Sequence, residues 1–164
     1  MNGLAELRRL ACDQIRTKYP NLPEPAICSP KYSDKSANDL TRAIVDFIML
    51  SGGWATRIST TGQMRPGGGT ETNPKMKWVY GTSKRGTADI HAVFCGKHLS
   101  IEVKLGNDRQ SIYQKQVEQQ VNAAGGLYYL ARDFESFFQF IEGIKKAPAD
   151  TRAKYLTTTQ HINT

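Results

Sequence analysis

Two acidic residues and a lysine lie in two neighbouring segments whose patterning is typical of β-strands. Asp89 belongs to segment 87–95, and Glu102 and Lys104 belong to segment 99–105. Because side chains alternate along a strand, Glu102 and Lys104 point to the same face. A tight turn between the segments would make them antiparallel neighbours and bring Asp89 to the same part of the sheet as Glu102.

Two converging carboxylates beside a backbone carbonyl suit a hard divalent cation such as Mg²⁺ or Mn²⁺, which prefers oxygen ligands. Hydrolysis of a phosphodiester needs such a cation, a water placed for attack, and a group that makes this water more nucleophilic. Lys104 lies on the correct face to orient and polarise the water. The alternative is that Glu102 and Lys104 are ordinary solvated strand residues, since alternating charges are common on exposed strands.

Apolar periodicity and capping signals predict the elements that position these residues. Ser36 and Asp39 form a capping box that opens a helix, which Gly52-Gly53 ends, so Asp39 is interpreted as a cap and not as a metal ligand. The other expected elements are a helix over 4–18, strands over 54–59, 75–80, 87–95 and 99–105, a turn at 96–97, a helix over 111–124 capped by Ser111, a strand over 127–131, and a helix after Asp133.

The segment 62–72, GQMRPGGGTET, is expected to be a long mobile loop, because its glycines and proline favour loop conformations. Trp78 and Tyr80, which follow it, could stack on bases, but packing is the slightly favoured interpretation.

The order of helix, three strands (54–59, 87–95 and 99–105), helix, strand and helix predicts an α/β fold with a central mixed sheet flanked by helices, and the candidate strand 75–80 stands outside this order. We expect an N-terminal helix and linker over residues 1–35, one main domain over 36–145, and a polar tail over 146–164.

The charge balance favours a polyanionic partner. The chain has 164 residues with 22 Lys+Arg against 15 Asp+Glu, a formal net charge of +7. No apolar run is long enough to suggest a membrane partner, and three scattered cysteines indicate neither a disulfide framework nor a thiolate metal site. We therefore expect a cytoplasmic protein.

The motif residues resemble the PD-(D/E)XK nuclease superfamily, and most closely its virus-type replication-repair nuclease (VRR-NUC) branch, which includes phage and bacterial Holliday-junction-resolvase-like enzymes. The resemblance rests on Asp89, on Glu102-Val103-Lys104, and on Ser111 to Gln114 continuing to Gly125-Gly126. It implies a restriction-endonuclease-like core of αβββαβ order over about 36–144. It also implies Asp89, Glu102 and the Val103 carbonyl as metal ligands, Lys104 as the catalytic lysine, and Gln114 as a glutamine that faces the site from a helix.

Two positions depart from the pattern of this superfamily. Many members carry a glutamate near the start of the first core helix, where this chain has Ala37-Asn38-Asp39, so Asn38 would be a weaker or water-mediated contact and the number of metals stays open. The proline that names the superfamily is replaced by Ala88.

The leading interpretation is a Mg²⁺- or Mn²⁺-dependent endonuclease acting on DNA, with a preference for branched structures that comes from the resemblance alone. The alternatives are a non-catalytic nucleic-acid-binding module and a nuclease acting on RNA. A homodimer could place two sites on paired strands, although no interface is evident.

Several basic residues are candidate contacts outside the carboxylate cluster. Arg57, Lys84 and Arg85 are expected to bind backbone phosphates, or else to form a solvated basic rim. His91 shares the face of Asp89 and would contact phosphate or a metal ligand, although a histidine satisfied within the fold explains it equally well.

Overall fold

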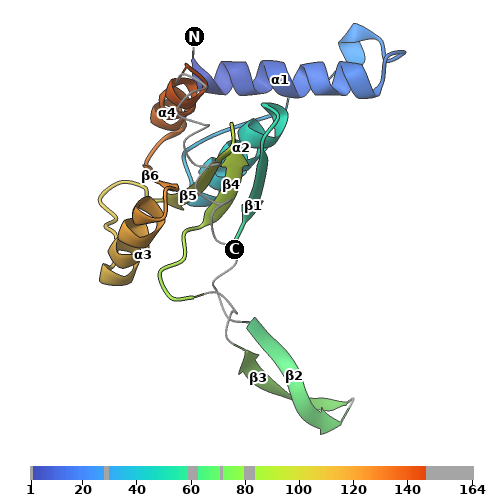
Figure 1. Ribbon diagram of the computed structural model, residues 1–164. Coiled ribbons are helices and arrows are strands. Elements are labelled where there is room, and N and C mark those ends of the chain that lie inside the picture. The colour runs from blue at the N-terminus through green and yellow to red at the C-terminus, as the bar shows by residue number, and fades with distance from the viewer. Residues whose placement is uncertain (1, 28–29, 59–62, 71, 80–83, 147–164) are drawn as a thin grey trace, which may run out of the picture.

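The computed structural model describes residues 2–27, 30–58, 63–70, 72–79 and 84–146 (Figure 1). The elements in chain order are α1 (Gly3–Lys18), a short 3₁₀ helix (Glu24–Ala26), α2 (Ala37–Leu50), β1 (Trp54–Arg57), β2 (Gln63–Thr70), β3 (Asn73–Val79), β4 (Ile90–Phe94), β5 (Lys97–Val103), α3 (Ile112–Ala123), β6 (Leu127–Ala131) and α4 (Phe134–Lys146). The expected tail over 146–164 lies outside the described residues except for Lys146.

A four-stranded mixed sheet forms the centre of the protein. Its strand order is β1-β4-β5-β6, in which β4 pairs antiparallel with β1 and β5, whereas β5 and β6 are parallel. The parallel pair needs a crossover connection, and α3 supplies it. The predicted α/β class with a mixed sheet and flanking helices is confirmed.

One face of this sheet is buried against α2 and α4. Alternate residues of the strands, among them Ile90 on β4 and Ile101 on β5, join the helix residues in one apolar cluster. Phe47 of α2 lies at its centre and makes edge-on contacts with three rings of α4, at centroid distances of 5.6–6.2 Å. The opposite face of the sheet carries Glu102, and α3 lies over part of it, beside β6.

Residues before α2 contribute to this core. Leu7 of α1 is fully buried within the apolar cluster, and Gly3 lies so close to α4 that an added Cβ would be 2.8 Å from Cβ of Phe138. The Asp34 carboxylate accepts a hydrogen bond of 3.1 Å from the Phe134 amide at the start of α4. The N-terminal helix is therefore packed on the domain through specific contacts.

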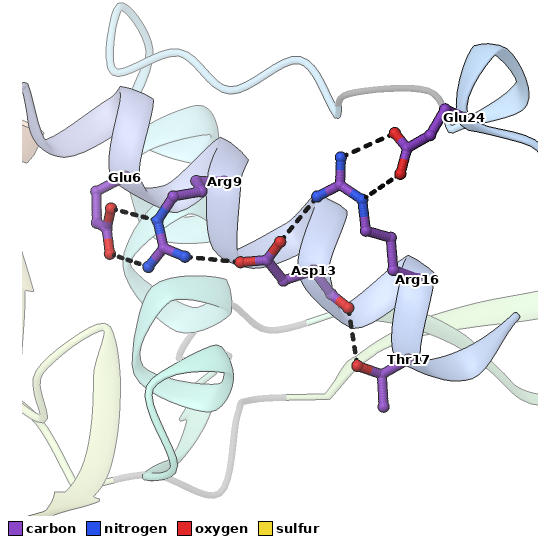
Figure 2. A network of polar contacts seen from close by, with 6 residues as sticks. All are labelled: Glu6, Arg9, Asp13, Arg16, Thr17 and Glu24. Atoms are coloured by element: carbon purple, nitrogen blue, oxygen red, sulfur yellow. Dashed lines mark hydrogen bonds and ion pairs between the residues drawn. The ribbon is translucent and has the colours of Figure 1, made fainter. Parts of the chain in front are cut away.

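The outer face of α1 carries a series of ion pairs (Figure 2). Arg9 contacts Glu6 and Asp13 at 2.6 and 2.7 Å, and Arg16 contacts Asp13 and Glu24 at 2.8 and 3.0 Å. Such exposed pairs add little to stability. Their consequence is electrostatic, because they neutralise two arginines that would otherwise add to the positive surface of the protein.

The turn between β4 and β5 lies at Cys95-Gly96, so its prediction at 96–97 is wrong by one residue. Cys95 has φ 49° and Gly96 has φ 74°. Two successive residues with positive φ are typical of a two-residue hairpin turn whose twist matches that of its strands. The turn was predicted to begin at Gly96 because glycine favours a positive φ, but Cys95 before it also has a left-handed conformation.

The prediction of an irregular loop over 62–72 is also wrong. β2 and β3 pair antiparallel from Gln63 with Val79 to Thr70 with Asn73, and the ribbon extends away from the four-stranded sheet (Figure 1). The register shifts between Pro66 and Gly69, where Gly68 and Gly69 have positive φ. Gly68 and Gly69 thus form a β-bulge within the ribbon, and the strands continue on both sides of it.

None of the helices in the described part of the chain is both long and apolar enough to cross a membrane.

The packing of α1 generates a stability prediction. Leu7→Ala should lower the free energy of unfolding by about 2–5 kcal/mol, because it removes a fully buried side chain from the core cluster. Urea denaturation measures this change. Leu22→Ala, at an exposed leucine after α1, is the control and should change stability by less than about 0.5 kcal/mol. Equal effects of the two substitutions would show that α1 does not fold as part of the core.

Candidate active site

Asp89 immediately precedes β4 and lies opposite Glu102. Ile90 pairs with Ile101, and one further step of this antiparallel register brings the next two residues, Asp89 and Glu102, side by side. Oδ2 of Asp89 accepts a hydrogen bond of 2.9 Å from the amide of Val103. The carboxylate is therefore held beside the strand that carries Glu102, as the sequence predicted.

Glu102 is a buried acid on the face of β5 that α3 covers. It is only 2% exposed. Its Oε1 accepts a hydrogen bond from the side-chain amide of Gln114 and lies 3.4 Å from Nζ of Lys104. Its Oε2 is buried and has no hydrogen-bond partner among the described residues. Burying a carboxylate oxygen without a partner costs free energy, so a positively charged ligand next to Oε2 would be favourable.

Burial raises the pKa of Glu102 to about 7, and the negative charge of Asp89 adds to this rise. The positive charge of Lys104 opposes it but does not outweigh it. The two carboxylates thus repel one another across a poorly solvated space, and a cation between them would relieve both the repulsion and the burial of charge.

Lys104 is a protonated amine in this arrangement. Burial lowers its pKa, but the hydrogen bond to Asp108 and the charge of Glu102 raise it by more, so the net shift is upward. Its Nζ lies 3.1 Å from Oδ2 of Asp108. The prediction that Glu102 and Lys104 point the same way is confirmed by their 3.4 Å contact, whereas the bridge to Asp108, four residues along in a loop, was not foreseen.

The helix cap of α3 aims Gln114 at Glu102. Ser111 caps the helix, and the Gln114 side chain completes the capping box: its Oε1 accepts a hydrogen bond of 2.8 Å from the Ser111 amide. With the oxygen engaged there, the amide nitrogen is left to donate to Glu102. The local signal that opens the helix therefore also orients the glutamine, and its predicted place facing the site is observed.

Gly86 allows the segment before Asp89 to lie against the start of α3. It has φ +86°, and an added Cβ would be 2.5 Å from the carbonyl oxygen of Tyr113. Arg85 stacks over the ring of Tyr113 at 3.8 Å, and Lys84 donates a hydrogen bond of 3.2 Å to Gln120. This docking, which sequence reasoning missed, fixes the first turn of α3 and hence Gln114 relative to Asp89.

Three candidate phosphate contacts are thus placed. Lys84 and Arg85 both remain exposed, although each also touches α3. Arg57 is exposed on β1 and donates a hydrogen bond of 2.9 Å to Oδ1 of Asn38 at the start of α2. No direct hydrogen bond joins Asn38 to Asp89 or Glu102 in the described part of the chain, so a contact of Asn38 with a metal at the carboxylates stays a prediction.

His91 faces the same side of the sheet as Asp89 but contacts another histidine. Its ring lies edge-on to that of His98 at 5.4 Å, and burial and the charge of His98 lower its pKa. Both rings line a pocket of about 420 Å³ together with Ser100 of β5 and Val117 and Val121 of α3. The alternation of β5 could have predicted His98 and Ser100, because they share the face of Glu102.

The pocket exists because α3 packs incompletely on the sheet. The helical spacing of Tyr113, Val117, Val121 and Ala124 predicts a buried stripe, but α3 has no buried residue: the two valines are half-buried, and Tyr113 and Ala124 are exposed. This helix is held by polar contacts at its first turn more than by a core, which explains the error of the prediction.

The residues present fit a divalent cation with few protein ligands. Among the described residues no three His, Cys, Asp or Glu side chains converge, so Asp89 and Glu102 would be the side-chain ligands. The N–H and C=O of a strand residue point to the same neighbouring strand, so the carbonyl of Val103 points to the side of Asp89, as its amide does. Two carboxylates and a carbonyl leave room for waters, which is the coordination that Mg²⁺ prefers.

No protein family model matches the chain, and no curated protein is significantly similar to it.

The contact at Gly86 generates a stability prediction. Gly86→Ala should cost several kcal/mol, because strain of about 1–2 kcal/mol from the positive φ adds to a clash with the backbone of α3. Gly52→Ala is a matched control, since Gly52 has φ +84° but nothing within 4 Å of its added Cβ. Chemical denaturation of both variants measures the difference. Equal losses would mean that Gly86 is needed for its φ alone.

The raised pKa of Glu102 generates a prediction of pH dependence. The neutral acid favours the folded state, so its stability contribution is complete below pH 4.5 and is lost as pH rises through about 7. In EDTA, Glu102→Gln should therefore be more stable than the wild type at pH 8, by about 3 kcal/mol at most, and this advantage should vanish near pH 4.5.

Glu135→Gln supplies a control of opposite sign. The amide of Gly3 donates a hydrogen bond to Glu135 and lowers its pKa, so the charged form stabilises the fold and Glu135→Gln should lose stability at pH 8. Thermal melts from pH 4.5 to 8 test both variants. A gain for Glu102→Gln that did not vary with pH would refute the assigned cause.

Proposed function

We propose that this protein is a metal-dependent endonuclease that hydrolyses phosphodiester bonds in DNA. The observation that carries the proposal is the buried, unpartnered oxygen Oε2 of Glu102, with a second carboxylate on the adjoining strand and the amine of Lys104 at 3.4 Å from its other oxygen. Structural ion pairs do not need an oxygen left without a partner, whereas a cation site does.

Asp89, Glu102 and the carbonyl of Val103 would hold Mg²⁺ or Mn²⁺. When bound, such an ion supplies positive charge that neutralises the phosphate and makes a water more acidic. Gln114 fixes the orientation of Glu102 through Oε1, which leaves Oε2 directed to the ion. The carboxylate must be ionised to act as a ligand, so the cation would hold Glu102 deprotonated despite its burial.

Lys104 would act on the attacking water as a cation. Its raised pKa keeps it protonated, so it cannot serve as a base at neutral pH. An ammonium close to the water favours the hydroxide form and offsets the negative charge that develops on the phosphate. Asp108 limits the motion of Nζ by its contact at 3.1 Å.

The fold agrees with the resemblance to the PD-(D/E)XK superfamily and its VRR-NUC branch. The elements α2, β1, β4, β5, α3 and β6 follow one another in the αβββαβ order that the resemblance implies, with Asp89 just before β4, Glu102 on the neighbouring β5 and Gln114 on the crossover helix, and this order supports the proposal. On this basis we extend the proposal to a restriction-endonuclease-like core.

A cleavage assay tests the proposed function. The purified chain is incubated with supercoiled, linear and four-way-junction DNA and with single-stranded RNA, in Mg²⁺, Mn²⁺ or EDTA. Cutting of DNA should require a metal and should fall by at least about 100-fold in Asp89→Asn, Glu102→Gln and Lys104→Ala, because each removes a ligand or a charge at the reacting phosphate.

Matched controls separate chemistry from folding. Lys97→Ala removes another lysine of β5, and Asp46→Asn removes a carboxylate that binds Tyr32 on the far side of the core; both should keep the wild-type rate. Wild-type rates in Lys104→Ala would refute its role. Tight binding without cutting in any metal would favour a non-catalytic nucleic-acid-binding module, and cutting of RNA alone would change the substrate.

A further inference from the structure

The β2–β3 ribbon has two chemically different faces. Met64 pairs with Trp78 and Arg65 pairs with Lys77, and neighbouring residues alternate between the faces. One face therefore carries apolar side chains, which are Met64, Pro66, Met76 and Trp78. The other face carries basic side chains, which are Arg65, Lys75 and Lys77.

The apolar face is open to solvent. Met64, Met76 and Trp78 are 51%, 50% and 45% exposed, although each is a large apolar side chain. A two-stranded ribbon by itself is marginally stable in water, and a contiguous exposed apolar patch usually marks a binding surface. The earlier preference for packing of Trp78 is therefore not met within the described residues.

The basic face is complementary to a polyanion. Segments 63–70 and 72–79 contain no acidic residue, and no salt bridge of Arg65, Lys75 or Lys77 is found in the described part of the chain. Gly67 adjoins Lys77, because an added Cβ would be 2.7 Å from Cβ of the lysine. Because Gly67 has no side chain, the backbone of a nucleic acid can approach this face of the ribbon closely.

The ribbon is inserted in the chain between β1 and β4, two paired strands of the central sheet. Arg57 at the end of β1 pairs with Ile90, the residue after Asp89. The two strands that flank the ribbon in the chain therefore meet beside Asp89.

We propose that the β2–β3 ribbon is a nucleic-acid-binding arm that selects substrates with unpaired bases. Its basic face holds backbone phosphates, and its apolar face, through Trp78 and the two methionines, takes bases that are not stacked in a helix. That the ligand is nucleic acid rests on the proposed function. A second copy of the chain is the poorer occupant, because it would bring an equally basic ribbon.

The need for unpaired bases follows from the chemistry of the apolar face. A duplex presents phosphates and base edges, while the flat faces of its bases are covered by their neighbours. An indole ring gains most from stacking on a free base face. Arg65 and Lys77 should thus contribute to binding of every nucleic acid, whereas Trp78 should contribute only where bases are splayed apart.

Fluorescence anisotropy in EDTA tests this division, since binding is then measured without cleavage. The labelled probes are a duplex, the same sequence with a splayed fork, and one single strand. Trp78→Ala should weaken binding to the fork and the single strand about tenfold and leave the duplex almost unchanged. Arg65→Gln with Lys77→Gln should weaken all three and reduce the slope of log affinity against log salt by about 2.

Two substitutions outside the ribbon are matched controls. Trp54→Ala removes an exposed tryptophan of β1, and Lys18→Gln removes an exposed cation of α1; both should bind all probes as the wild type does. Equal effects of Trp78→Ala and Trp54→Ala would overturn the proposal. A lower oligomeric mass of Trp78→Ala with unchanged affinities would also overturn it, in favour of a second copy on the apolar face.

The two proposals fail in different ways. Without cleavage in any metal the proposed endonuclease is refuted, but the effect of Trp78→Ala on binding to the fork and the single strand in EDTA still decides the role of the ribbon. If cleavage depends on Glu102 and the ribbon variants bind and cut forks normally, only the arm is refuted.

Discussion

The candidate site depends on one constraint, which is that a carboxylate buried in the sheet must have its charge compensated. Glu102 receives a hydrogen bond from Gln114 at one oxygen and has Lys104 near that same oxygen, while its other oxygen has no partner among the described residues. The cap of α3, the docking of Gly86 and the pairing of β4 with β5 all serve to hold these groups around a single side chain. The free energy lost by burying the acid is what a bound cation would recover.

Much of this arrangement could be predicted because it is set by local patterns. The two-residue period of β5 places Glu102 and Lys104 on one face whatever the rest of the chain does. The capping box at Ser111 both starts α3 and orients Gln114, so a signal four residues long determines a contact with a distant strand. The final strand over 127–131 was predicted at its observed bounds for the same reason, because its apolar run ends at clear breakers.

What could not be predicted depends on contacts between distant residues. The glycines and proline of 63–70 favour a loop locally, but pairing with 73–79 turns them into a ribbon with a bulge. Gly86 reads as an ordinary turn glycine until α3 lies against it. Asn38 was assigned to the site by resemblance alone, and its hydrogen bond with Arg57 was not foreseen. A buried face is what fixes the register of paired strands, and this ribbon buries little, so its sequence specifies the pairing only weakly.

The proposed nuclease would need two kinds of charged surface, an acidic site for metal and a basic surface for nucleic acid, and these lie in different parts of the protein. Two carboxylates repel a phosphate until a cation neutralises them, so affinity must arise elsewhere on the surface. Arg9 and Arg16 of α1 are paired with nearby acids, and Lys104 is paired with Asp108, so these cations add little to the external field. Among the described residues, no acidic side chain forms an ion pair with the basic face of the ribbon. A net charge of +7 is therefore informative only once its distribution is known, because this distribution would attract a polyanion to the ribbon and would leave the acids free for the proposed metal.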